Sequence, residues 1–291
     1  MTKGKGWAKS LVLVFVLAAV LALVGCGGGS ETKVTADEVV QDALAAQANV
    51  HTGHVEINIV ADAEGTLSGN PLDASLNATL TADIDWANKK MKADLGMNAN
   101  YNGLSFPISM GVFAVDNCSY IQTQFGTMTD NWTRAEFPMD FWQGLTSNQT
   151  IDINSILQNT DAESLPDQKV NGINCYVVQL KPDISAIQAT LSGEAGYDED
   201  MPDIENLIKS LTIKVWVARD TSYVTKMEMT LSAHVTGEAV GQLGSSDVLD
   251  VNFSITVLMT DVNKAVTIEV PAEAENAEWG NPLDMFSGFG F

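Results

Sequence analysis

Polar and apolar residues alternate with a period of two through much of this chain, and this pattern limits its fold more than any other feature. From Leu76 to Trp86 every second residue is apolar, and the residues between them are Asn, Thr or Asp. The same alternation recurs over residues 91–101, 104–112, 223–236 and 249–259. Alternation of this kind places one face of a strand in the core and the other in water, which is typical of antiparallel sheets. The chain is therefore predicted to build a many-stranded sheet, whose apolar face needs a second layer.

Short turn signals separate the strands. Asn102-Gly103 and Asn171-Gly172 each predict a two-residue hairpin, and residues 87–90 predict a tight turn. Helical spacing is confined to short segments, the first of which begins with a predicted capping box between Thr35 and Glu38. Further strands are expected at 113–124, around Trp132, and at 163–170, 173–181, 211–219 and 266–270. Helices are expected at 35–49, 138–159, 183–192 and 201–209.

The apolar face of these strands interleaves Ala with Leu and Met instead of using large residues throughout. Small residues leave room, and Met adapts to irregular partners. Two arrangements stay open: the sheet folds over and packs fully against itself, or it curls around the few helices and leaves an apolar cleft. In the second case we expect a ligand to be held by desolvation and shape. The predicted cleft residues are Leu76, Leu80, Ile84, Leu95, Met97, Met229, Leu231, Phe253 and Ile255.

The N-terminus has the pattern of a targeting segment. Three lysines precede an unbroken apolar run from Leu11 to Val24, which is short for a membrane span and typical of a signal-peptide core. The stretch Leu23-Val24-Gly25-Cys26 resembles the lipobox of bacterial lipoproteins, and it implies cleavage before Cys26 and diacylglycerol on its sulfur. We therefore expect a signal peptide at 1–25, a flexible tether at 26–34, one domain at 35–271, and a flexible acidic tail with aromatic residues at 272–291.

The net charge of the chain is −22. Removal of residues 1–25, which hold three Lys and no acid, leaves 12 Lys and Arg against 37 Asp and Glu, a net charge of −25. Such a surface repels nucleic acid and anionic headgroups. Attachment to the extracytoplasmic face of the cell membrane is therefore expected to come from the acyl chains on Cys26.

Two cysteines remain beyond Cys26. An exported chain with the pair Cys118 and Cys175 is compatible with a disulfide. Both residues also lie in apolar strand patterns, where a free cysteine is an ordinary core residue. The sequence leaves the two alternatives open.

No catalytic pattern is present in the sequence. It holds no phosphate-binding loop, no dinucleotide fingerprint, no G-x-S-x-G elbow and no H-E-x-x-H. His51 and His54 form an H-x-x-H without an obvious third ligand, and the acidic residues at 198–205 lack the order of a calcium loop. We therefore expect no enzyme activity, no cofactor and no metal.

An ordered set of segments resembles a known group. The opening "TADEVVQDALAAQANVHTGHVEINIVADAEG", the hairpin "KVNGINCYVVQL", the strand pair "KVWVARDTSYVTKMEMTL" and the closing "DVNKAVTIEVPAEA" are similar to the LppX/LprG and LolA/LolB-like bacterial lipoproteins. The resemblance covers nearly all of the chain after Cys26. It implies an α+β half-barrel, in which a strongly curved antiparallel sheet wraps around a few short helices, and it implies carriage of a lipid.

Two functions remain open at this point. In the first, the protein is a membrane-anchored lipoprotein that binds an apolar or lipid-like ligand, with lipid transport as its role. In the second, it is a structural or interaction lipoprotein of the cell envelope with a packed core and no ligand. The sequence indicates no particular protein partner.

Overall fold

The computed structural model describes residues 34–129, 131–137, 142, 160–185, 204–237 and 246–280. The chain divides into two compact units. Unit 1 comprises Met1–Asn49 and Gln143–Ser246, and unit 2 comprises Val50–Trp142 and Asp247–Phe291. Most of the described residues are in strands, so the predicted antiparallel sheet is confirmed, and the helical share is smaller than an α+β fold suggests.

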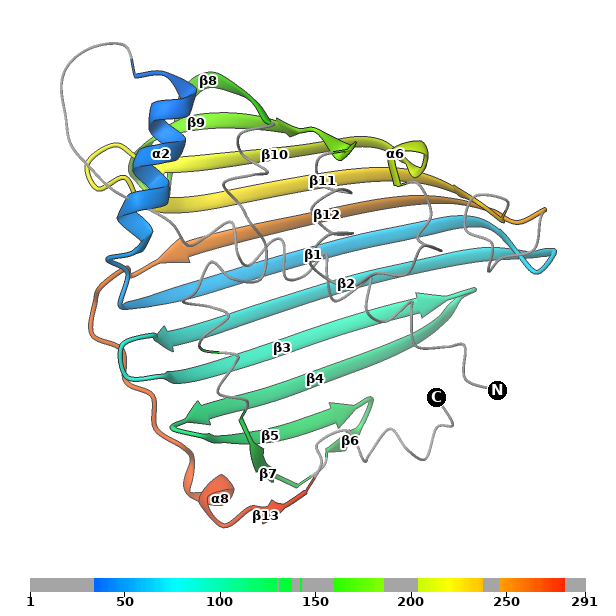
Figure 1. Cartoon of the computed structure of the whole chain (residues 1–291). Coiled ribbons are helices and arrows are strands. Elements are labelled where there is room, and N and C mark those ends of the chain that lie inside the picture. The colour runs from blue at the N-terminus through cyan, green and yellow to red at the C-terminus, as the bar shows by residue number, and fades with distance from the viewer. Residues whose placement is uncertain are drawn as a thin grey trace. The chain divides into compact units, whose positions relative to one another are not determined.

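The described residues of unit 1 include four antiparallel strands. Helix α2 lies against β8 and β9, and the one-turn helix α6 contacts β10 and β11 (Figure 1). The strands follow one another in the order β8, β9, β10, β11, and Asn171-Gly172 forms the predicted hairpin between the first two. The bounds are α2 (Ala36–Gln47), β8 (Thr160–Val170), β9 (Ile173–Pro182), α6 (Ile204–Leu207), β10 (Ile208–Ala218) and β11 (Val224–Thr236).

Helix α2 begins at the predicted capping box. The Thr35 hydroxyl accepts a hydrogen bond from the Glu38 backbone N–H at 3.2 Å, and the Glu38 carboxylate accepts one from the Thr35 backbone N–H at 2.8 Å. These bonds satisfy donors that the first turn of a helix otherwise leaves without partners. The bonds from the Thr35 backbone and side chain lower the pKa of Glu38. The carboxylate form of Glu38 is thus the one that the cap stabilises.

Replacing Thr35 with alanine is expected to lower the free energy of unfolding by about 1 kcal/mol at neutral pH. Because folding lowers the pKa of Glu38, its contribution is present above the ordinary pKa of a glutamate and is lost as the pH falls. The cost of Thr35→Ala should therefore shrink in acid. Urea denaturation of the wild type and of Thr35→Ala, once at neutral pH and once in acid, measures this cost. Glu38→Gln, which keeps an acceptor in the same place, is the matched control and should cost less than Thr35→Ala at neutral pH.

Among the residues that the structure describes, the side-chain amide of Gln47, in the last turn of α2, has no hydrogen-bond partner, although Gln47 is only 3% exposed. A buried polar group without a partner costs about 1–3 kcal/mol. Gln47→Met keeps the shape of the side chain and removes the amide, so it is expected to raise the free energy of unfolding by about 1 kcal/mol. Gln41→Met, at an exposed position of the same helix, should change it little. A loss of stability on Gln47→Met in a urea titration would contradict this account.

Unit 2 contains a longer sheet that is antiparallel except at one edge. Its pairing order is β13-β7-β5-β4-β3-β2-β1-β12, and β6 pairs with β5. Figure 1 shows β1 to β5 as neighbours in chain order. The bounds are β1 (Thr52–Leu67), β2 (Asn70–Asp85), β3 (Lys90–Tyr101), β4 (Leu104–Val115), β5 (Cys118–Phe125), β6 (Met128–Thr129), β7 (Thr133–Glu136), β12 (Val248–Thr260), α8 (Ala272–Glu275) and β13 (Glu278–Trp279).

The turns of unit 2 decide its strand boundaries. Asn102-Gly103 forms the predicted hairpin, with φ values of 48° and 83° that lie in the left-handed region. The strand expected at 113–124 is instead the end of β4 and most of β5, because Asp116 adopts a φ of 56° and reverses the chain. Ser68-Gly69, not anticipated from the sequence, makes the turn between β1 and β2.

Two expectations for the last part of the chain differ from the structure. Residues 266–270 alternate in burial around Ile268 as a strand would, yet they pair with no strand and form an irregular segment. Residues 272–280, expected to be flexible, form α8 and β13, and β13 pairs in parallel with β7. The Arg134 guanidinium lies 4.6 Å from the centre of the Trp279 ring and fastens this segment to β7.

Cys118 and Cys175 are free cysteines in the structure and lie in different units, so a disulfide between them stays one of the two alternatives that the sequence left open. Cys118 begins β5 in unit 2, where its sulfur accepts a hydrogen bond from Arg134 Nη2 at 3.1 Å. Cys175 is fully buried in β9 of unit 1, and its sulfur lies 3.3 Å from the Thr225 hydroxyl. Each sulfur therefore has a partner within its own unit.

Candidate ligand-binding face

One face of the unit 2 sheet is apolar across six strands. The antiparallel register places Ile59 of β1 opposite Ala78 of β2, and Ala78 opposite Met97 of β3. The same register continues outward on both sides, and together these residues form what we term the central row. Its members, from β12 to β5, are Ile255, Ile59, Ala78, Met97, Ile108 and Phe125.

Further rows lie parallel to the central row on the same face, because side chains two residues apart on a strand point the same way. The row on one side consists of Phe253, Ala61, Leu76, Ala99 and Phe106. The row on the other side consists of Val257, Ile57, Leu80, Leu95, Met110 and Thr123. We call these three rows together the apolar face.

Burial across the apolar face falls from β12 toward β5. Ile255 and Ile59 are 2% and 4% exposed, whereas Met97, Ile108 and Phe125 are only half-buried. Alanines recur between the larger residues, as the sequence suggested. The part of the face over β3, β4 and β5 therefore offers apolar surface that unit 2 leaves partly open to solvent.

The opposite face of the same strands is polar. A typical row there contains Thr256, Asn58, Thr79, Gly96, Ser109 and Gln124. His54 also lies on this face, where its Nδ1 is 2.8 Å from Asp83 Oδ1 and its Nε2 is 3.5 Å from Glu56 Oε1. In the described part of the chain no three His, Cys, Asp or Glu side chains form a group that could hold a metal ion. The carboxylate contacts of His54 account for its position without a metal.

Seven of the nine predicted cleft residues lie on one face of the unit 2 sheet. They are Leu76, Leu80, Ile84, Leu95, Met97, Phe253 and Ile255. Met229 and Leu231 lie in β11 of unit 1, where they pair with Ile213 and Leu211 of β10. Whether any of the nine touches a ligand stays a prediction. Cys26, the predicted lipidation site, lies outside the described residues, as do most of residues 138–159 and 186–203.

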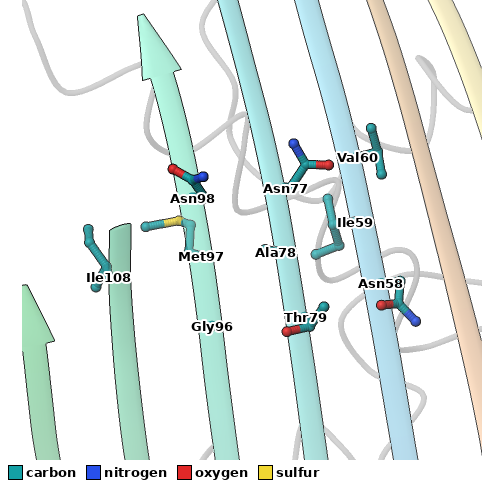
Figure 2. A pocket seen from close by; sticks show the side chains of 10 residues that line it. All are labelled: Asn58, Ile59, Val60, Asn77, Ala78, Thr79, Gly96, Met97, Asn98 and Ile108. Carbon is teal, nitrogen blue, oxygen red and sulfur yellow. The ribbon is translucent and has the colours of Figure 1, made fainter. Parts of the chain in front are cut away.

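A shallow hollow with a volume of about 370 Å³ lies over the middle of β1 to β4. Figure 2 shows the side chains that line it. Four of them, Ile59, Ala78, Met97 and Ile108, belong to the central row. The other six, Asn58, Val60, Asn77, Thr79, Gly96 and Asn98, alternate with these along β1 to β3, so these positions belong to the opposite face of the sheet. Of the predicted cleft residues, Met97 lines this hollow.

That Ile59, Ala78 and Ile108 share one row was not predicted from the sequence. A usable signal was present, because a two-residue hairpin fixes the register of its strands. Asn102-Gly103 alone places Ile108 opposite Met97. Placing Ala78 opposite Ile59 in the same way requires the Ser68-Gly69 turn, and Ser-Gly is a weaker hairpin signal than Asn-Gly.

The fold and this face define an antiparallel-sheet protein with an extended apolar surface on one side. The chain belongs to the family of unknown function DUF6612, which it matches over residues 35–278. No curated protein matches it. Among the residues that the structure describes, no helix has both the length and the hydropathy needed to cross a membrane.

Solved structures that match include lipoproteins of the group that the sequence resembles. LppX from Mycobacterium tuberculosis is 12% identical, with 78% of this chain and 94% of LppX covered and a TM-score of 0.32. LprF from Mycobacterium bovis is 14% identical, with coverage of 81% and 97% and a TM-score of 0.43. A putative outer membrane lipoprotein-sorting domain from Vibrio parahaemolyticus is 10% identical, with coverage of 77% and 90% and a TM-score of 0.21.

Proposed function

We propose that this protein is a lipid-anchored, extracytoplasmic lipoprotein that binds an apolar or lipid-like ligand against the apolar face of unit 2. The observation that carries the proposal is the continuity of the central row, in which six apolar residues from six strands stand directly opposite one another. An acyl chain laid across such rows is taken out of water along its length, and each buried CH₂ group contributes about 0.8 kcal/mol. Binding of this kind uses no catalytic residue.

The anchor and the half-barrel shape are part of the same proposal. The lipobox ending at Cys26 supports lipidation, and the acidic surface makes acyl chains the expected means of attachment. A sheet that curves around its ligand would bring the rows on both sides of the central row into contact with it. The alternation of Ala with larger residues on this face supports such a fit, since small residues leave space for a guest.

Ala99 offers a direct test. It lies between Leu76 and Phe106 on the apolar face, so Ala99→Phe fills the space that the ligand is proposed to use. Overpacking of this kind costs about 1–3 kcal/mol, which corresponds to ligand binding that is about 5- to 150-fold weaker. Thr81→Phe adds the same ring at an exposed position on the opposite face and is the matched control.

The measurement is mass spectrometry of lipids extracted from the purified full chain. Wild type and Thr81→Phe are expected to release one lipid-like compound in near-equal amounts, and Ala99→Phe should release far less. The proposal fails if wild type releases no more lipid than an unrelated lipid-anchored protein purified in the same way.

A structural or interaction lipoprotein with a packed core is the second candidate. The near-complete burial of Ile59, Ile255 and Val257 favours it, because this part of the apolar face is already shielded by protein. Under this alternative, Ala99→Phe destabilises the fold and no lipid is found in either variant. The extraction and a urea titration of the same two variants therefore separate the two functions.

A further inference from the structure

Four large apolar side chains are exposed together at one end of the unit 2 apolar face. Tyr101 and Leu104 flank the Asn102-Gly103 turn and are 49% and 62% exposed, Phe106 is 39% exposed and Met128 is 64% exposed. Register places all four on the same face: Tyr101 pairs with Leu104, Phe106 follows on β4, and Met128 pairs with Phe125 of the central row. We call these four residues the tip patch. The Gly126 backbone N–H donates to the Pro107 carbonyl at 3.0 Å and ties the β5–β6 turn to β4 beside the patch.

The segment that carries the tip patch is almost free of charge. From Leu95 to Thr129 the only ionisable acid or base among Asp, Glu, Lys, Arg and His is Asp116, in a chain where 18% of residues are charged. Asp116 lies in the turn between β4 and β5, at the other end of β4 from the tip patch. Around the Asn102-Gly103 turn both faces are neutral, because the polar face there carries Asn98, Asn100 and Ser105.

We propose that the tip patch is a membrane-docking surface that enters the interfacial region of a lipid bilayer. A protein partner requires only that the contacting face be apolar. A hairpin that enters a bilayer meets lipid on every side, and both of its faces must then be uncharged. The tip of the β3–β4 hairpin meets this stricter condition. Tyr and Phe beside neutral polar residues are typical of the membrane interface.

The surrounding charges limit how deep the patch can go. Asp73 of β2 is the neighbouring acid, since its backbone N–H donates to Asn102 Oδ1 at 2.8 Å. A carboxylate at this position keeps the adjoining strand in water, so only the turn and the first residues of β4 are placed among the lipids. The net charge of −22 repels anionic headgroups, and docking is therefore expected to be stronger on zwitterionic than on anionic bilayers.

The β8–β9 hairpin supplies a matched control within the same chain. It has the same Asn-Gly turn, at Asn171-Gly172, and one exposed apolar residue, Ile173, at 43% exposure. Its strands carry charges close to the turn, among them Asp167 and Lys169. A hairpin of this composition is not expected to enter a bilayer.

The experiment uses the full chain with the photoreactive residue p-benzoylphenylalanine in place of Leu104 or, as the control, Ile173. Each form is mixed with vesicles of deuterated phosphatidylcholine, illuminated and digested for mass spectrometry. Adducts carrying deuterated lipid are expected at 104 and not at 173, and fewer are expected when the vesicles contain phosphatidylglycerol. The deuterium label separates bilayer lipid from any lipid that the protein carried through purification, so this proposal and the proposed ligand can fail independently.

A second experiment places the photoreactive probe elsewhere in the tip patch, so that residue 104 itself can be varied. With the probe in place of Met128, Leu104→Asp is expected to reduce lipid adducts about fivefold, the effect of a cost of about 1 kcal/mol for a charge at the interface. Leu104→Ser should reduce them less. Equal lipid adducts at 104 and 173 would overturn the proposal. So would adducts at 104 that join it to a second copy of the chain or to another protein instead of lipid.

Discussion

Gly65→Ala is expected to lower the free energy of unfolding by about 3 kcal/mol or more. Gly65 lies in β1 opposite Leu249 of β12 and has a φ of 151°, a conformation that L-residues rarely adopt. A Cβ at this position would lie 2.0 Å from the Val248 carbonyl oxygen and 2.9 Å from its carbon. Both atoms belong to the backbone of the partner strand, so the clash is relieved only by separating the strands.

Gly69→Ala is the matched control for this prediction. Gly69 also has a positive φ, of 75°, but a Cβ at this position would have no atom within 4 Å outside its chain neighbours. It should cost only the left-handed penalty of about 1 kcal/mol. Urea denaturation of the two variants gives the difference. Equal losses would show that the backbone conformation, and not the contact with Val248, sets the cost at Gly65.

Trp216→Ala is expected to cost about 3–5 kcal/mol. Trp216 is 4% exposed in β10 and forms a buried cluster of unit 1 with Cys175 and Val177, against which Leu165 and Val170 pack. Its Nε1 donates to Gln168 Oε1 at 3.0 Å. The Lys226 ammonium lies 4.5 Å from the ring centre on the neighbouring strand. The substitution removes this packing and leaves the Gln168 amide without its indole donor.

Two further variants separate the contributions of Trp216. Trp216→Phe keeps a ring and removes the Nε1 hydrogen bond. It should lower the free energy of unfolding by more than the value of a single hydrogen bond, which is about 1 kcal/mol, and by less than Trp216→Ala does. Trp279→Ala removes the same side chain at 59% exposure, where the main contact is the Arg134 guanidinium, and should cost about 1 kcal/mol. A loss at Trp279 as large as that at Trp216 would contradict this account of the unit 1 core.

The elements that the sequence predicted well are those whose signal is local. The capping box of Thr35 and Glu38 marks the start of α2, and the two Asn-Gly turns lie where the hairpins are. The turn at Asp116 was missed because neither it nor Asn117 is a glycine. Residues 266–270 show what periodicity does not predict. Alternate burial around Ile268 indicates an extended backbone, but it does not indicate that the segment pairs with another strand.

The sequence predicted most of the residues of the candidate face, but it did not predict how the strands that carry them are arranged. Seven of the nine chosen residues share one face of unit 2, which follows from alternation along each strand. Met229 and Leu231 lie in unit 1, and whether they share a ligand with the other seven stays a prediction. The exposed tip patch was not anticipated at all, because exposure depends on where neighbouring strands end.

The amino-acid sequence by itself determined most of the strands, the face that each turns inward, the hairpins at Asn102-Gly103 and Asn171-Gly172, and the helix cap, because these depend on residues close together in the chain. Only the tertiary structure decided that Ile255, Ile59 and Phe125 stand in one row, and that β13 joins β7. These features depend on which distant strands pair and in what register, and pairing is a property of the assembled sheet.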